Sequence, residues 1–228
     1  MKKIRYLTML FLTLLSFLGS AGFASAAAPV VLVLGDSLSA AYGLSEKAGW
    51  VNLLREKLAA RNPPYDVVNA SISGDTTRGG LSRLDAALKQ HKPQIVIIEL
   101  GGNDALRGLS LRTMRSNLDS MVNTIQQAHA KPLIVGVEMP PNYGPVYTQQ
   151  FAQVFQEIAQ KYNVPLVPSI FAGFSGKYDL FQSDGIHPVA TAQPIMLETV
   201  WKGLAPLLED VPGKSALLLK NSGSGQVR

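Results

Sequence analysis

Five short apolar runs recur along the chain, and each has the length of a β-strand. They are rich in valine and isoleucine and do not alternate with polar residues, which is typical of strands buried on both faces of a sheet. The runs are Val30–Leu34, Val67–Ala70, Ile95–Leu100, Leu133–Val137 and Leu166–Val167. This pattern predicts a sheet that is covered on both sides.

Apolar residues at helical spacing lie between these runs and after the last of them. The helical segments carry Trp50, Leu54 and Leu58; Leu81, Leu84 and Leu88; Leu118, Met121, Val122 and Ile125; Phe151, Phe155 and Ile158; and the stretch from Ile195 to Leu208. Strands and helices that alternate at this spacing are joined by right-handed crossovers, so the strands run parallel. We therefore predict an α/β fold with a parallel sheet between two layers of helices.

The first 26 residues have the pattern of a secretory signal peptide. Basic residues at positions 2, 3 and 5 precede an apolar stretch from Tyr6 to Leu18, and Ala24-Ser25-Ala26 fits a small-x-small cleavage site. The alternative is a membrane anchor that stays attached, but the apolar stretch is shorter than the roughly 20 residues that a spanning helix needs. We expect a mature protein without a membrane span that is exported, to a periplasm or beyond.

Composition narrows the classes of function. The chain has 21 Lys and Arg against 16 Asp and Glu, but three of the basic residues lie in the first 26 positions and three lie in the tail. Residues 27–213 therefore have a net charge of −1. The sequence thus contains no basic patch that would indicate binding to nucleic acid. The absence of cysteine excludes disulfides, Cys–zinc sites and thiol catalysis. Residues 27–213 suffice for one hydrophobic core, so we predict a single domain, and we expect a monomer.

The tail from residue 214 to 228 differs in composition from the rest. The tail contains Asn221-Ser222-Gly223-Ser224-Gly225, a composition typical of a linker. It also contains a short apolar patch, Ala216–Leu219, for which the sequence pattern offers no other apolar segment to pack against. We expect this tail to be disordered.

Four polar clusters carry the candidate chemistry, and the first three each follow a predicted strand. They are Gly35-Asp36-Ser37, Ser73-Gly74-Asp75, Gly102-Asn103-Asp104 and Asp184-Gly185-Ile186-His187-Pro188. Ligands of open α/β sheets bind beyond the carboxyl ends of the strands, where parallel strands would bring these clusters together. Together they offer a nucleophile, an oxyanion hole and a base with its orienting acid, the set that a serine esterase needs.

The base follows by elimination, because the chain has only three histidines. His91 and His129 each precede a predicted strand, so each should lie at the amino end of the sheet, away from the crevice. His187 remains, with Asp184 three residues before it to hold the imidazole through Nδ1–H. The alternative is that Asp184 caps the following helix and that His187 is a surface residue.

The oxyanion hole would consist of the backbone N–H groups of Ser37 and Gly74 and the side-chain amide of Asn103. Gly74 has an alternative interpretation as a turn glycine. The remaining acids of these clusters are interpreted as structural groups that cap helices or fix loops: Asp36, Asp75 and Asp104.

Other chemistries fit the sequence less well. Asp184 and His187 could be two metal ligands, but the further acids that a metal site needs are scattered, so no metal and no cofactor are expected. Neither G-x-G-x-x-G nor G-x-x-x-x-G-K-[ST] occurs, which disfavours a nucleotide-binding domain. G-x-S-x-G is absent as well, so the usual nucleophile elbow of α/β-hydrolases is excluded.

In these residues the chain resembles the SGNH, or GDSL-type, hydrolases, whose four marker blocks occur here in order. They are Gly35-Asp36-Ser37-Leu38-Ser39, Ser73-Gly74-Asp75-Thr76, Gly101-Gly102-Asn103-Asp104 and Asp184-Gly185-Ile186-His187-Pro188. The resemblance covers almost all of residues 29–208. Within the family, Pro140-Pro141-Asn142-Tyr143-Gly144 adds a closer similarity to bacterial periplasmic thioesterases, lysophospholipases and arylesterases.

The resemblance implies a three-layer α/β/α, flavodoxin-like fold with five parallel strands. It implies Ser37 as nucleophile, His187 as base with Asp184 as its partner, and Gly74 and Asn103 as oxyanion donors. Substrates would be small-molecule aryl esters, acyl thioesters or lysophospholipids. Two alternatives stay open at this point: a carbohydrate-deacetylating esterase of the same fold, and a secreted binding module without activity.

Overall fold

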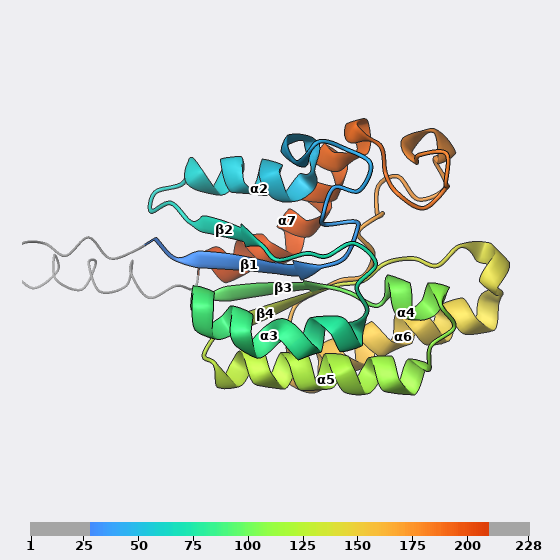
Figure 1. Cartoon of the computed structure of the whole chain (residues 1–228), viewed down its shortest axis with the longest axis horizontal. Helices are drawn as coiled ribbons and strands as arrows, with labels where there is room; N and C mark the ends of the chain where they lie inside the picture. The colour runs from blue at the N-terminus through green and yellow to red at the C-terminus, as the bar shows by residue number, and fades with distance from the viewer. Residues whose placement is uncertain (1–27, 210–228) are drawn as a thin grey trace, which may run out of the picture.

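Five parallel strands form one sheet in the order β2-β1-β3-β4-β5 in the computed structural model, which describes residues 28–209 (Figure 1). The strands are β1 (Val30–Gly35), β2 (Asp66–Asn69), β3 (Ile95–Glu99), β4 (Lys131–Val135) and β5 (Leu166–Val167). All four strand pairings are parallel. The predicted parallel sheet is therefore confirmed, although β4 begins and ends two residues before its predicted bounds.

Helices cover both faces of this sheet (Figure 1). One face carries α2 (Trp50–Ala59) and α7 (Gln193–Glu209), and the other carries α3 (Thr77–His91), α5 (Leu111–Gln127) and α6 (Pro145–Tyr162). The pattern did not predict the short α4 (Gly102–Leu106), nor the 3-10 turns η1 (Glu46–Ala48), η2 (Pro141–Tyr143), η3 (Tyr178–Leu180) and η4 (Ala190–Ala192). Segments of three to five residues are too short to show a helical period.

The strand order places a crevice at the carboxyl edge of the sheet. The chain leaves β1 for β2 on one side and then crosses to β3 on the other, so β1 and β3 flank the point where the direction of winding reverses. Loops on either side of such a point diverge, and ligands of this fold class bind between them. The first three polar clusters follow β1, β2 and β3, so the fold brings them to this crevice.

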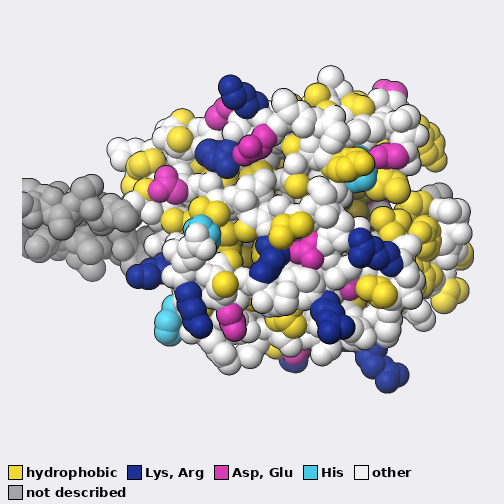
Figure 2. Space-filling model, viewed as in Figure 1, with side chains coloured by type: hydrophobic (Ala, Val, Ile, Leu, Met, Phe, Trp, Pro, Cys, Tyr) yellow, Lys and Arg dark blue, Asp and Glu magenta, His cyan; other side chains and the backbone are white. Residues whose placement is uncertain are grey.

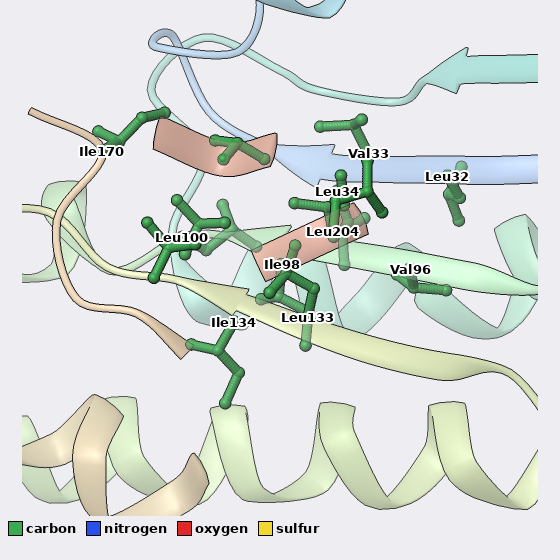
Figure 3. Packing of buried hydrophobic residues seen from close by; sticks show 14 of the residues in the cluster. Leu32, Val33, Leu34, Val96, Ile98, Leu100, Leu133, Ile134, Ile170 and Leu204 are labelled. Carbon is green, nitrogen blue, oxygen red and sulfur yellow. The ribbon is translucent and has the colours of Figure 1, made fainter. Parts of the chain in front are cut away.

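The core is built from the strands' apolar residues and the facing sides of the helices. Val31, Leu32, Val33 and Leu34 of β1 are fully buried, as are four consecutive residues of β3 from Ile95 to Ile98. Figure 3 shows side chains of β1, β3 and β4 packed together, with Leu204 of α7 against them and Ile134 directed towards the opposite helix layer. The rigid sheet therefore supports the loops that extend from its carboxyl edge.

Two predictions fall outside the described residues: the signal peptide over residues 1–26 and the disordered tail over residues 214–228. Between residues 28 and 209, no helix combines the length and the apolar character that crossing a membrane requires.

Candidate active site

The four polar clusters meet at the carboxyl edge of the sheet, around one cavity of about 550 Å³. Ser37, Gly74, Asn103 and His187 all line it. Asp184 lies behind His187, where its carboxylate contacts the imidazole. The structure thus brings together every residue that the sequence singled out for the site.

Ser37, His187 and Asp184 form a continuous chain of short contacts. The Oγ atom of Ser37 lies 2.9 Å from Nε2 of His187, and Nδ1 of the same imidazole lies 2.7 Å from Oδ2 of Asp184. The first contact joins residues 150 positions apart, whereas the second lies within one turn. With Nδ1 protonated, the imidazole donates to Asp184 and accepts the hydroxyl proton of Ser37, which is the arrangement of a serine nucleophile with its base.

The turn from Asp184 to His187 is held by the carboxylate itself. Oδ1 of Asp184 accepts hydrogen bonds from the amides of Ile186 and His187, at 2.9 and 3.0 Å, and Gly185 has a φ of +69°, which glycine adopts without strain. Partial burial acts to raise the pKa of Asp184. The bonds from the amide and the imidazole of His187 and from the Ile186 amide outweigh it and lower that pKa to about 2. Asp184 therefore stays ionised beside the imidazole.

Two residues that the sequence did not indicate support this turn. The ring of Tyr42 lies over the imidazole of His187, with 4.3 Å between ring centroids. The side-chain amide of Gln182 donates to the carbonyl of Tyr42 at 2.8 Å and to that of Pro188 at 3.2 Å. Gln182 thus connects the loop after β1, which carries the serine, to the segment that carries the histidine.

The three predicted oxyanion donors border the same space. Within residues 28–209, neither the Ser37 amide nor the Gly74 amide has an acceptor in the protein, so both N–H groups are available to a ligand. Gly74 has a φ of +79°, and its carbonyl accepts a 2.7 Å hydrogen bond from Arg107 at the end of α4. The Asn103 amide donates to Asp36 at 2.9 Å, which leaves its second N–H unassigned.

The remaining acids of the clusters have structural contacts, as predicted. Asp75 accepts from the Thr76 amide and pairs with Arg83 at 2.8 Å. Asp104 accepts from both the amide and the hydroxyl of Thr77, at 2.8 and 2.5 Å, which joins α4 to the start of α3.

Asp36 has a second contact beyond its loop. One of its carboxylate oxygens accepts from the Leu38 amide at 3.0 Å and the other accepts from Asn103. It also lies against Glu99, a buried acid at the end of β3 that falls within the apolar run Ile95–Leu100. A carboxylate within such a run is itself a signal, because burial of an unpaired acid is rare.

The other two histidines lie away from the site. His91 ends α3, ahead of β3, and His129 lies in the turn before β4, so both are at the amino edge of the sheet. Neither lines the cavity. Across residues 28–209, no three His, Cys, Asp or Glu side chains gather in the manner of a metal site.

The rest of the cavity wall is largely apolar. Its lining includes Val137, Met139, Phe171, Phe181 and Ile186. Figure 2 shows apolar side chains gathered at the end of the molecule that carries the loops after the strands, whereas charged side chains of both signs are spread over the rest of this face. A polar reacting corner beside an apolar wall suits a substrate with an apolar group next to the reacting bond.

Comparisons with known proteins cover the whole site. The profile of the GDSL-like Lipase/Acylhydrolase family matches residues 33–193, from before Ser37 to beyond His187. The chain is 50% identical over 183 residues to the esterase TesA of Pseudomonas aeruginosa, covering 80% of this chain and 91% of that protein. It is 42% identical over 203 residues to thioesterase 1/protease 1/lysophospholipase L1 of Escherichia coli, covering 89% and 93%.

A solved structure gives the same likeness. The psychrotrophic esterase EstA from Pseudoalteromonas sp., in a structure inhibited by monoethylphosphonate, superposes with a TM-score of 0.75 at 41% identity and covers 79% of this chain and 99% of that one. The five-stranded sheet described above is therefore shared with an esterase.

Proposed function

The chain belongs to the GDSL-like Lipase/Acylhydrolase family, and from this we infer that it hydrolyses carboxylic esters and thioesters through an acyl-enzyme on Ser37. The observation that carries the covalent route is the unbroken contact from Ser37 through His187 to Asp184. A binding module without activity would have no use for this arrangement.

The proposed mechanism follows from the positions of these groups. His187 takes the proton of Ser37 at Nε2 while the hydroxyl oxygen attacks the carbonyl carbon, and Asp184 stabilises the resulting imidazolium. The amides of Ser37 and Gly74 and the side chain of Asn103 stabilise the oxyanion. His187 then gives the proton to the leaving alcohol or thiol, and a water molecule activated by the same histidine releases the acid.

The substrates that we propose are aryl esters, acyl thioesters and lysophospholipids. The apolar wall formed by Val137, Met139, Phe171 and Phe181 supports an acyl chain as the group that lies in the cavity. A series of p-nitrophenyl esters with acyl chains of two to sixteen carbons tests this directly. Longer chains should react well if the wall binds them, whereas a preference for acetate alone would favour a deacetylase.

Substitution of the serine tests the mechanism. Ser37→Ala should lower kcat by about 10⁴- to 10⁶-fold, and the double variant with His187→Ala should fall no further, because the members of a catalytic triad act as a unit. Ser120→Ala is the matched control, since its hydroxyl on α5 makes only a solvent-exposed hydrogen bond to the Ser116 carbonyl. Wild-type turnover by Ser37→Ala would refute the acyl-enzyme.

We also propose that the protein is exported and acts as a monomer. The basic start, the apolar stretch and the small residues near Ala26 support removal of a signal peptide. Amino-terminal sequencing of protein recovered from the periplasm or the medium of a bacterial host would test cleavage, and light scattering would test the monomer. A mature protein that still begins at residue 1 would contradict the signal peptide.

A further inference from the structure

Two buried acids lie side by side beneath the nucleophile. Glu99 ends β3 and is 1% exposed, and Asp36 follows β1 and is 2% exposed. The parallel register pairs Glu99 with Gly35, the residue before Asp36, so the sheet itself brings the two carboxyl groups together. The two carboxyl groups are close enough for the charge of Asp36 to act on Glu99.

The surroundings provide hydrogen bonds but no counter-ion. Asp36 accepts from the Leu38 amide and from the Asn103 side chain, and Glu99 accepts from the Ser39 hydroxyl at 2.7 Å. Among residues 28–209, no Lys, Arg or His forms an ion pair with either acid. The titratable groups that face Asp36 are His187, from the last polar cluster, and Asp75, from the loop after β2. Arg83 of α3 donates to the carbonyl of Gly35, the residue before Asp36, but its ion pair is with Asp75.

A pair of this kind must hold a proton. Two carboxyl groups that share a buried site without a counter-ion repel each other when both are ionised, so one of them keeps its proton. Burial, followed by the charge of Asp36, raises the pKa of Glu99 well above its usual range, and burial also raises the pKa of Asp36 to about 6. Asp36 accepts from an amide and a side-chain N–H that both favour its charged form, so the proton belongs to Glu99.

Given the proposed function, we propose that Glu99 is a neutral carboxylic acid that donates to Asp36, and that this pair is the positioning unit for Asn103. Because the ionised Asp36 can only accept, it draws Nδ2 rather than Oδ1 of Asn103 towards itself and fixes the orientation of the amide. The second N–H of Asn103 is then free for the oxyanion. A proton on Glu99 also removes a second buried negative charge, which would oppose the charge that develops on the substrate.

The protonation state can be measured without reference to activity. Infrared difference spectra of wild type and Glu99→Gln at neutral pH should show loss of one carboxylic-acid C=O band in the variant. Glu198→Gln is the matched control, because Glu198 is exposed and paired with Lys57, so it should remove a carboxylate band instead. A carboxylate band lost in Glu99→Gln would overturn the proposal.

Glu99→Gln is also expected to fold and to unfold cooperatively at neutral pH, because a neutral amide can donate to Asp36 and accept from Ser39. A variant that fails to fold would show that the charge of Glu99 is needed and would overturn the proposal. If wild type hydrolyses no ester, the proposed function fails, while the infrared result still decides the state of Glu99.

A double-mutant cycle tests the positioning role. Asn103→Ala should lower kcat by about 10²- to 10³-fold with little change in KM, as expected for one oxyanion donor. Asp36→Asn, which no longer forces the orientation of the amide, should cost at least tenfold in kcat, and the double variant should be no slower than Asn103→Ala alone. Losses that multiply in the double variant would show that Asp36 does not act through Asn103.

Discussion

The carboxyl groups of Asp184 and Glu99 lie in different environments, and these environments favour opposite protonation states. Asp184 lies at the surface and receives two backbone hydrogen bonds, and its pKa is lowered to about 2. Glu99 is fully enclosed, and its pKa is raised. Environments that push the pKa values of nearby acids apart separate their roles. Here one acid stays charged to serve the imidazole, while the other stays neutral behind the oxyanion donors.

The raised pKa of Glu99 predicts how stability depends on pH. A glutamate titrates near pH 4.3 in an unfolded chain, so above that pH the folded state holds a proton that the unfolded state releases. This contribution to stability is fully present below about pH 4. It is lost as the pH rises towards the folded-state pKa, by up to about 1.4 kcal/mol per pH unit.

Glu99→Gln removes this dependence. Its Tm relative to wild type should therefore increase between pH 5 and pH 8 in matched thermal unfolding scans. If the difference in Tm between Glu99→Gln and wild type were constant across this range, Glu99 would titrate like an ordinary surface acid. The control variant Glu198→Gln should show such a constant difference from wild type.

Short motifs made the residues that face the cavity predictable. Ser37, Gly74 and Asn103 each follow a strand, and the topology determines where strand ends lie. Glu99 could be recognised as an acid in an apolar run, but its pairing with Asp36 depends on the register of β1 and β3. No local pattern encodes that register, so the carboxyl pair could not be predicted from the sequence.

Individual elements were predictable where their apolar pattern is long. The strands and the five long helices follow from apolar runs and helical spacing, and the errors lie at their ends. β4 ends at Val135, although the Gly136 amide still donates to the Val167 carbonyl of β5, and Val137 lines the cavity. The apolar run continues past the end of the strand to Val137, so hydrophobicity alone could not locate that end.

Gly136 gives a prediction at this scale. Its amide donates to the Val167 carbonyl, and a Cβ atom there would lie 2.5 Å from the Pro168 carbonyl oxygen. Because that neighbour is backbone, the end of β4 would have to move away from β5. Gly136→Ala should lower the free energy of unfolding by about 1–3 kcal/mol, as measured by urea denaturation.

Gly203→Ala is the matched control on the neighbouring helix α7. A Cβ atom there would meet side-chain atoms and no backbone atom, Leu133 Cδ1 at 2.8 Å and Val167 Cγ2 at 2.9 Å, so side chains and not the strands have to shift. Alanine also stabilises a helix interior by roughly 0.5–1 kcal/mol relative to glycine. The two substitutions should therefore differ clearly, and equal losses would show that the contact with the Pro168 backbone is not the cause.

At the scale of the whole molecule, the site depends on two segments that are distant in sequence. The serine lies on the loop after β1, and the histidine lies 150 positions later, just before α7. Apart from the contact between Ser37 and His187, few polar contacts join these two segments. The most direct is the Gln182 side chain, which donates to the carbonyls of Tyr42 and Pro188.

Gln182→Ala should therefore impair catalysis more than it impairs folding. Without the two hydrogen bonds the segments can separate slightly, and a misplacement of about 1 Å between reacting groups can cost roughly 10²-fold in rate. We expect a loss of about 10- to 100-fold in kcat on p-nitrophenyl esters with only a small decrease in Tm. Gln126→Ala is the matched control, since this exposed glutamine makes one 3.4 Å contact with the Tyr162 carbonyl, far from the cavity. If Gln182→Ala kept the wild-type kcat, the distance between Ser37 and His187 would not depend on these two hydrogen bonds, and the positioning role of Gln182 would be wrong.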